Sequence, residues 1–215
     1  AIFKGNKYRI TILSERLIRF EYDANGKFFD HPTEFARFRN FSVPDFQVEE
    51  NDKTIVIQTK YFVLQYVKER PFVGPKYAPD QNLKVGLMNS DKIWYFNHPE
   101  ARNFGATKVS LDKGIRGPLK RGLYSTDGFA SFDDSKSLVF MEDGFLVKPT
   151  TKRVDTYLFI YRRDFGLCLK DYFTLTGLPP LLPRYALGIW WNRDMIYSFE
   201  DTKKLIKAFN QHSIP

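Results

Sequence analysis

The first three-quarters of the chain shows the alternation of apolar and polar residues that is typical of half-buried β-strands. The alternation is clearest over residues 8–13 and 17–22, which are separated by a short turn. Further strands are predicted on the same grounds at residues 54–59, 62–67, 92–96, 128–132, 137–141 and 156–161. Many short strands with turn residues between them, and no long helical pattern, predict a β-sandwich.

A proline-rich stretch ends this pattern. Residues 177–183 read GLPPLLP, and three prolines so close together exclude both a central strand and a helix interior. We therefore predict a linker over residues 177–184. Immediately before it, residues 167–174 fit either a short helix or the end of a strand.

The residues after the linker predict one strand followed by one helix. Residues 185–191 form a nearly continuous apolar run, the pattern of a strand buried on both faces. Ser198 and Asp201 have the spacing of a capping box. Apolar residues then recur at helical spacing as far as Phe209, with lysines on the opposite side. The helix is expected to end at Asn210. Residues 213–215 resemble the entry to a further strand.

Composition allows a large core and argues against a nucleic-acid partner. The 215 residues are 43% hydrophobic, which is enough for a packed domain and excludes a disordered chain. Lysine and arginine total 33 against 25 acids, for a net charge of +8. These charges are scattered and often lie beside acids, as in Lys152-Arg153 followed by Asp155. A solvated basic surface is favoured over a nucleic-acid site.

Several kinds of chemistry are not expected. Cys168 stands alone in an apolar run and is predicted to be a buried, inert thiol. The three histidines lack paired spacing, so neither a zinc site nor any other cofactor is expected. No apolar stretch reaches about 18 residues, so no membrane span is expected. The chain begins without Met or a signal-peptide pattern, so we expect a processed N-terminus or a missing start. The lone cysteine and the missing signal pattern favour the cytoplasm.

Residues 182–193, LPRYALGIWWNR, followed by Tyr197 and Ser198, resemble the strand that opens the catalytic barrel in glycoside hydrolase family 31. This is the α-glucosidase and α-xylosidase family. Residues 121–135 resemble the hairpin that precedes the barrel in that family, and the loop at residues 103–114 is also similar. Together the motifs cover roughly residues 97–215.

The resemblance implies a mainly β protein cut short within its second domain. Residues 1–176 would form a galactose-mutarotase-like β-sandwich, and residues 185–215 the first βα unit of a truncated (β/α)₈ barrel. A barrel needs about 250 residues, so most of it would be absent. The nucleophile and the acid/base aspartate of the family lie on later barrel strands. No catalytic residue is therefore assigned in this chain, and the chain alone is expected to be inactive.

The resemblance also suggests residues that bind substrate. Active sites of such barrels lie at the C-terminal ends of the strands, which selects Trp191, Asn192, Arg193, Asp194 and Tyr197. Aromatic faces suit the C–H surface of a pyranose, and the polar groups suit its hydroxyls. The alternative is that the aromatic residues belong to a core.

Three aspartates outside the barrel segment also need an interpretation. Asp112, in the polar loop over residues 97–121, is a further candidate for a sugar hydroxyl, although a turn-stabilising role is also open. The adjacent Asp133 and Asp134 must point apart, so they are interpreted as a hairpin turn and not as a catalytic pair.

Two functions from different classes remain. The first is the N-terminal part of a retaining glycosidase that acts on an oligosaccharide or α-glycoside, in which the sandwich supports and partly lines the active site. The alternative is a non-catalytic carbohydrate-binding sandwich. Neither involves nucleic acid or a membrane. The apolar residues of an incomplete βα unit would lack partners, so we also expect self-association into a homo-oligomer.

Overall fold

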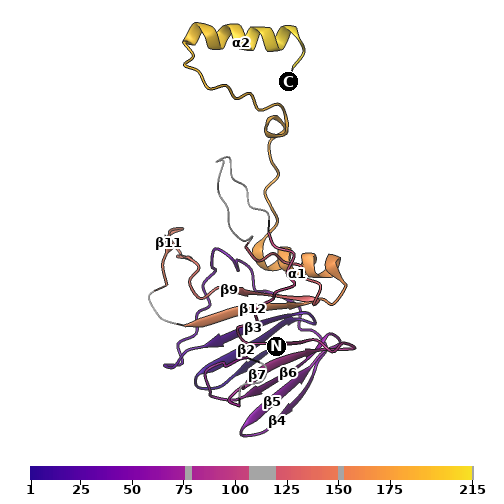
Figure 1. Ribbon diagram of the computed structural model, residues 1–215. Coiled ribbons are helices and arrows are strands. Elements are labelled where there is room, and N and C mark those ends of the chain that lie inside the picture. The colour runs from indigo at the N-terminus through magenta and orange to yellow at the C-terminus, as the bar shows by residue number, and fades with distance from the viewer. Residues whose placement is uncertain (76–78, 107–119, 150–152, 215) are drawn as a thin grey trace. The chain divides into compact units, whose positions relative to one another are not determined.

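Two antiparallel five-stranded sheets form the framework of residues 1–177, as far as the structure describes them. The structure is a computed structural model that describes residues 1–75, 79–106, 120–149 and 153–214 (Figure 1). The first sheet has the order β1 (Ile2–Lys4), β2 (Tyr8–Ser14), β3 (Leu17–Tyr22), β12 (Val154–Ile160), β9 (Phe129–Asp133). The second has the order β4 (Gln47–Glu50), β5 (Thr54–Gln58), β6 (Phe62–Val67), β7 (Leu83–Leu87), β8 (Ile93–Tyr95). A short hairpin joins β10 (Val139–Phe140) to β11 (Leu146–Val147).

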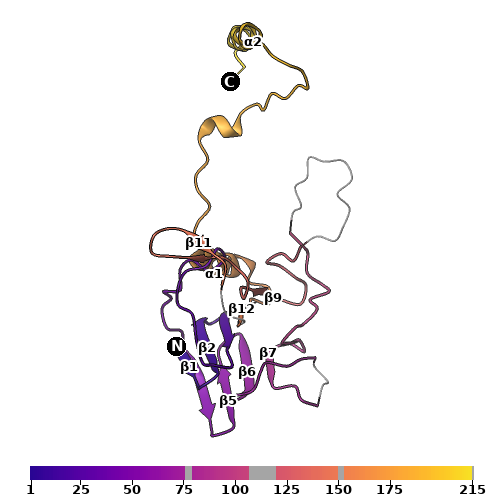
Figure 2. The ribbon, with the colours of Figure 1, turned by 90° about the vertical axis from the view of Figure 1, so that its left-hand side faces the viewer.

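The two sheets face each other across one hydrophobic core (Figures 1 and 2). Phe20 of the first sheet stacks on Trp94 of the second, with ring centroids 5.4 Å apart. Ile10 and Leu158 from one sheet and Leu64 from the other are fully buried in the same core. This arrangement confirms the predicted mainly β sandwich.

A second core lies on the other face of the first sheet, under helix α1 (Phe165–Thr176) (Figure 1). Cys168 and Leu175 of the helix pack with Tyr157 and Phe159 of β12. Of the two interpretations of residues 167–174, the helix is therefore the right one. Cys168 is 1% exposed, which confirms that the cysteine is buried, and burial raises the pKa of its thiol.

Every segment predicted as a strand in the first three-quarters of the chain contains one. The alternation did not reveal β1, β4, β7 or β11. All four residues of β4 are exposed, and so are both residues of β11. These two strands therefore have no buried face from which an apolar period could arise.

Residues 178–215 form a separate compact unit, and here the structure corrects the prediction. The strand expected over residues 185–191 is absent, because Arg184–Leu187 form a 3₁₀ helix, η1, and residues 188–191 have no regular structure. Residues 213 and 214 are likewise not in a strand. A strand needs hydrogen-bonded neighbours, and none of the described residues of this unit supplies one.

The helix of this unit is as predicted. α2 runs over Phe199–Gln211, beginning at the capping box. The Ser198 hydroxyl accepts a hydrogen bond from the Asp201 amide at 3.2 Å, and the Asp201 carboxylate accepts one from the Ser198 amide at 3.2 Å. A capping box forms from local contacts, which explains why it could be recognised from four residues.

Candidate functional site

Five of the six residues predicted to bind substrate lie between η1 and α2. Asn192, Arg193 and Asp194 are exposed. Trp191 is 51% exposed, and its ring meets the ring of Phe209 edge to face, with centroids 5.4 Å apart. Helix α2 therefore holds one edge of the Trp191 indole, while half of the residue remains accessible.

The neighbouring Trp190 makes different contacts. Its indole nitrogen donates a hydrogen bond to the Ala186 carbonyl oxygen at 3.0 Å, and the residue is 81% exposed. The two adjacent tryptophans are thus held by different elements, Trp190 by η1 and Trp191 by α2. An exposed indole is a suitable surface for the C–H face of a pyranose.

Tyr197 ends this segment, immediately before the N-cap of α2. Its hydroxyl is buried and makes no hydrogen bond with the residues that the structure describes. A buried phenol without a partner is unfavourable and is available to a ligand or to another part of a larger protein. Together the five side chains offer an indole, an amide, a guanidinium, a carboxylate and a phenol, the groups that recognise sugars.

Asp112 lies outside the described residues, but both flanks of its loop are described. Ala106 donates a backbone hydrogen bond to Lys120 at 2.7 Å. The Asn103 side chain joins the flanks, since its oxygen accepts from the Gly122 amide at 2.8 Å and its nitrogen donates to the Gly122 carbonyl at 2.9 Å. Residues 106 and 120 therefore lie next to each other at a closed base, which Asn103 holds.

Glu100 fixes the incoming flank of this loop to the first sheet. The Glu100 carboxylate accepts hydrogen bonds from the amide of Ser131, at 2.9 Å, and from the Ser131 hydroxyl. The residue is 3% exposed, and burial raises the pKa of its carboxyl. The base of the Asp112 loop is thus tied to strand β9.

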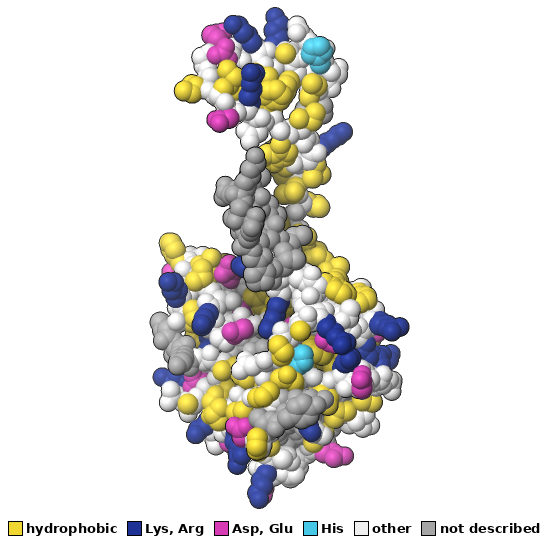
Figure 3. Space-filling model, viewed as in Figure 1, with side chains coloured by type: hydrophobic (Ala, Val, Ile, Leu, Met, Phe, Trp, Pro, Cys, Tyr) yellow, Lys and Arg dark blue, Asp and Glu magenta, His cyan; other side chains and the backbone are white. Residues whose placement is uncertain are grey.

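The charges of the sandwich are less solvated than the sequence suggested. On the face in Figure 3, basic and acidic side chains are interspersed. The first sheet, however, buries a charge cluster that we define as Arg9, Glu21, Arg19 and Asp155. Arg19 holds Asp155 through hydrogen bonds of 2.9 and 2.7 Å, and Arg9 holds Glu21 at 2.5 and 2.8 Å. For Arg153 and Asp155, the interpretation as surface charges was wrong.

The pair Asp133 and Asp134 divides as predicted. Asp133 is exposed, whereas Asp134 is fully buried and accepts a hydrogen bond from the Thr33 hydroxyl at 2.7 Å. Burial, and then the nearby Asp155, raises the pKa of Asp134 to about 6. The two carboxyl groups point apart and cannot act on one bond.

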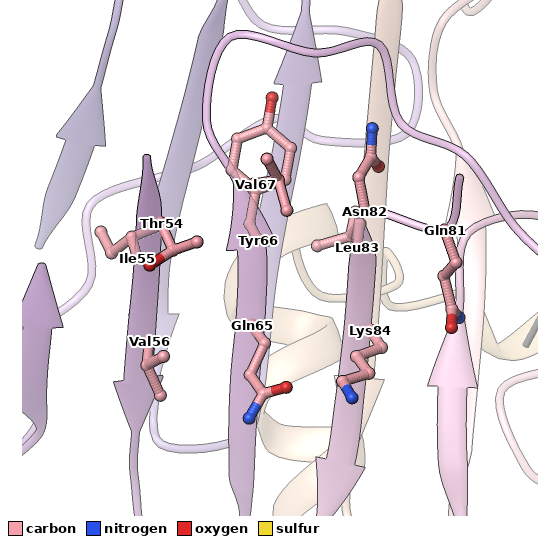
Figure 4. Close-up of a pocket in the computed structure, with 10 residues that line it drawn as sticks. All are labelled: Thr54, Ile55, Val56, Gln65, Tyr66, Val67, Gln81, Asn82, Leu83 and Lys84. Atoms are coloured by element: carbon pink, nitrogen blue, oxygen red, sulfur yellow. The ribbon is translucent and has the colours of Figure 1, made fainter. Parts of the chain in front are cut away.

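A recess of about 310 Å³ lies on the second sheet (Figure 4). Val56, Gln65 and Lys84 come from three neighbouring strands, and Gln65 is paired with both Val56 and Lys84. The recess is lined by one cation, Lys84, and by the amides Gln65, Gln81 and Asn82. Unlike the segment after η1, it contains no carboxylate and no indole.

The sequence did not reveal a further cavity in the sandwich, of about 300 Å³, which we call the inter-sheet groove. It is lined by residues of β8, β9 and β12 and the turns beside them: Trp94, Phe96, Asn97, Arg121, Ser131, Asp133, Ser135, Lys136, Arg153, Val154 and Thr156. No local pattern marks this groove, because its lining residues come from segments far apart in the sequence. Within the described ranges, no group of three metal-ligating side chains occurs. None of the described helices is long and apolar enough to cross a membrane.

Comparison with known proteins shows what this chain is similar to. The sequence is 32% identical to an alpha-xylosidase of Saccharolobus solfataricus over 88 residues, which is 41% of this chain and 11% of the relative. No protein-family model matches the chain.

The structure resembles a GH31 dextranase of Flavobacterium johnsoniae, with a TM-score of 0.54 and 14% identity, over all of this chain and 31% of that one. It also resembles the cycloalternan-forming enzyme of Listeria monocytogenes, with a TM-score of 0.55 and 14% identity, over all of this chain and 25% of that one. The resemblance to glycoside hydrolase family 31 is therefore confirmed. The chain spans a third or less of the length of each of these proteins.

Proposed function

We propose that this chain is the N-terminal part of a retaining α-glycosidase of glycoside hydrolase family 31. The observation that carries the proposal is the 88-residue match to an alpha-xylosidase at 32% identity. The likeness in fold to a GH31 dextranase, over the whole chain, supports it. That dextranase is in complex with isomaltotriose, and the cycloalternan-forming enzyme with a pentasaccharide substrate. The proposed substrate is accordingly an oligosaccharide or another α-glycoside.

In this proposal the chain supplies binding groups and no catalytic group. Trp191 offers its free indole surface to a sugar ring, and Asn192, Arg193, Asp194 and Tyr197 bind hydroxyls. Asp112 is proposed as a further group that binds a sugar hydroxyl, in a loop whose base is held by Asn103. The sandwich acts as the support on which this loop is mounted.

A retaining mechanism needs two carboxyl groups about 5–5.5 Å apart, one as nucleophile and one as acid and then base. In the proposed protein both lie on barrel strands that follow residue 215. The 215-residue chain is therefore expected not to turn over substrate. Its contribution to the reaction is to bind and orient the sugar.

The proposal is tested with aryl α-glucoside and α-xyloside substrates. The 215-residue chain is assayed beside the product of the same coding sequence extended past residue 215. We expect turnover only in the extended protein. Cleavage by the 215-residue chain, or binding of isomaltotriose by both proteins without cleavage by either, would overturn the proposal; the latter result would favour a carbohydrate-binding module.

Substitution of Asp112 tests the proposed role of the sandwich loop. In the extended protein, Asp112→Ala is expected to lower kcat/KM about tenfold, equivalent to about 1.4 kcal/mol of transition-state binding. The control is Asp91→Ala, because the Asp91 side chain is 89% exposed and is not a proposed binding residue. Equal kinetics for the two variants would remove Asp112 from the substrate site.

A further inference from the structure

Another cavity of the sandwich, which we call the turn cavity, has a volume of about 470 Å³. It lies among three turns: residues 88–92 between β7 and β8, residues 125–128 before β9, and residues 161–164 between β12 and α1. Its volume is larger than that of the recess or the inter-sheet groove. It falls within the range of small-molecule sites, about 300–1,000 Å³.

Contacts between the three turns fix the shape of the turn cavity. The Gly128 carbonyl oxygen accepts hydrogen bonds from the amides of Tyr161, at 2.9 Å, and Arg162, at 2.8 Å. A Cβ atom at Gly128 would lie 2.6 Å from the Arg162 Cα, so these two turns are in direct contact. The Arg162 guanidinium reaches the third turn, where it donates to the Met88 carbonyl at 3.4 Å, and it lies over the ring of Tyr61. The cavity is therefore formed by the fold itself, as is usual for ligand sites.

The carboxylate of Asp127 is a free acceptor in the turn cavity. Its Oδ1 atom lies 3.9 Å from Lys92 Nζ and 3.7 Å from a guanidinium nitrogen of Arg102. Both distances are too long for a hydrogen bond, and the described residues donate none to either oxygen of Asp127. The Asp127 side chain is only 12% exposed, but neither oxygen is sealed from solvent. Because a largely buried carboxylate gains by accepting hydrogen bonds, Asp127 is available to a ligand that donates.

The same cavity contains donors that the described residues leave unused. The Lys92 ammonium group makes no hydrogen bond with them, and its side chain is 34% exposed. Arg162 uses only its Nη1 atom, for the contact with Met88, so its Nε and Nη2 atoms remain. A hydroxyl group donates and accepts at the same time. Since Asp127 Oδ1 and Lys92 Nζ are 3.9 Å apart, one hydroxyl oxygen can lie within hydrogen-bond distance of both.

The charges of the lining favour a neutral ligand over an anion. The charged lining residues are three cations and two acids: Lys92, Arg162, Arg163, Asp127 and Asp164. The Asp164 carboxylate accepts a hydrogen bond from the Tyr61 hydroxyl at 2.7 Å, which holds it in place. The two carboxylates repel an anion that enters the cavity, whereas a hydroxylated ring can donate to them and accept from the cations.

An aromatic wall adjoins the turn cavity. Lys92 and Asp127 also line a second cavity of about 340 Å³, which we call the His98 cavity, together with Tyr95 and His98. The rings of Tyr95 and His98 contact each other, with centroids 4.6 Å apart. Burial lowers the pKa of His98, so its ring is neutral near pH 7. Uncharged ring faces suit the C–H surface of a pyranose, and the two cavities together have room for two joined sugar units.

We propose that the turn cavity and the His98 cavity together bind a neutral oligosaccharide of at least two sugar units. Hydroxyls of one unit pair with Asp127, Lys92 and Arg162, and the next unit lies against Tyr95 and His98. The site binds sugar without cleaving it. It does not depend on the proposed glycosidase function, because its residues belong to the sandwich and none of them is a proposed substrate-binding residue.

An NMR titration of the ¹⁵N-labelled 215-residue chain tests the site, because amide shifts report both the affinity and the location of binding. The probes are isomaltotriose, glucose and glucose 6-phosphate. We expect isomaltotriose to shift the amides of residues 89–92, 126–128 and 162–164, and to bind at least tenfold more tightly than glucose. Unchanged amides in these three turns, with or without shifts in residues 190–197, would overturn the proposal; shifts in residues 190–197 alone would still support the proposed substrate segment. Tighter binding of glucose 6-phosphate than of isomaltotriose would show an anion site instead.

Variants assign the binding to individual side chains. Asp127→Asn keeps the size of the side chain but removes its charge, and is expected to weaken the binding of isomaltotriose about tenfold. Because Asp127 lies in a tight turn, where a substitution can disturb folding, Lys92→Gln is the second variant, with an expected loss of about threefold. The control is Asp52→Asn, since Asp52 is exposed and lines neither cavity. Equal binding by Lys92→Gln and Asp52→Asn, together with undiminished binding by folded Asp127→Asn, would place the sugar elsewhere.

Discussion

Arg19 and Asp155 form a bidentate ion pair in which both side chains are at most 3% exposed. Arg19 lies on β3, Asp155 on β12, and the two strands are paired. Burial of two charges is costly, and the cost is offset only when each charge keeps its partner. The pair therefore adds little net stability as a unit, but the loss of one member leaves the other uncompensated.

Asp155→Ala is accordingly expected to lower the free energy of unfolding by about 3–5 kcal/mol. The measurement is urea denaturation at neutral pH, followed by circular dichroism. Asp91→Ala is the control, because its side chain is 89% exposed and a surface substitution of this kind should cost no more than about 0.5 kcal/mol. Similar losses for the two variants would show that the buried pair is energetically unimportant.

Asp134 predicts a dependence of stability on pH. Its pKa is raised from 3.8 to about 6, so the folded state binds the proton more tightly than the unfolded state. The contribution of Asp134 to stability therefore falls as the pH rises from about 4 to about 7, by at most about 3 kcal/mol. Asp134→Asn removes this pH-dependent contribution. The stability of the variant relative to the wild type should therefore increase as the pH rises over that range.

The measurement is urea denaturation of the wild type, Asp134→Asn and Asp133→Asn at several pH values between 4 and 7. Asp133 is the matched control because it is the adjacent residue, is exposed and lies on the same strand end. Parallel stability curves for the wild type and Asp134→Asn would mean that Asp134 does not change its protonation state on folding.

At the residue scale, sequence pattern identified the isolated special positions but not the buried charges. Cys168 was recognisable because its neighbours are apolar. Arg153 and Asp155 were not, because Lys152 beside them suggested a solvated cluster. Their burial depends on the aromatic ring of Phe29 and on Arg19, which lie more than 100 positions away in the sequence. Such pairings are a property of the sheet and cannot be read from a local window.

At the scale of elements, the predictions succeeded where apolar and polar residues alternate. In β5 and β6 the alternation follows burial on one face. β2, β3 and β12 are buried on both faces, and they alternate because polar residues such as Arg19 and Asp155 are buried among them. The apolar run over residues 185–191 has the composition of a buried strand, but the described residues include no strand beside it. Composition can specify that a segment will be buried. It cannot supply the hydrogen-bonded neighbours that a strand requires.

The base of the loop that contains Asp112 depends on a glycine. A Cβ atom at Gly122 would lie 2.4 Å from the carbonyl oxygen of Gly105, closer than any tolerable contact. Gly122→Ala is therefore expected to separate the two flanks and to break the hydrogen bonds of Asn103. The measurement is amide hydrogen exchange at Gly105, Ala106 and residue 122, where protection should be lost.

Gly166→Ala is the matched control, because a Cβ at Gly166 meets nothing within 4 Å. It lies in the first turn of α1, so alanine there should stabilise the helix by up to about 1 kcal/mol. Undiminished protection at the loop base in Gly122→Ala would show that the flanks can accommodate a side chain. In the extended protein, Gly122→Ala should reduce kcat/KM if Asp112 binds substrate.

At the scale of the whole molecule, the chain consists of two units with very different internal support. Both hydrophobic clusters draw all their members from residues 1–177. In residues 178–215, large apolar side chains are exposed: Leu181, Trp190, Ile196 and Phe199 are all more than 70% exposed. The sandwich thus has what it needs for independent stability, whereas the second unit has an unsatisfied apolar surface. This is what the proposed role as the start of a larger domain would require.

The contrast predicts how the chain behaves without residues 178–215. A chain of residues 1–177 keeps both cores, so its Tm should differ from that of the full chain by less than about 2 °C, the equivalent of at most about 1 kcal/mol.

The full chain is expected to self-associate through the exposed apolar residues of the second unit, and the shortened chain to remain monomeric. Differential scanning calorimetry measures the first effect and sedimentation velocity the second. The charge-reversing variant Lys204→Glu is a control, since it alters the exposed polar side of α2 without removing an apolar residue. A full chain that is monomeric at every concentration, or a shortened chain that melts much earlier, would show that the second unit is stabilised by the sandwich itself.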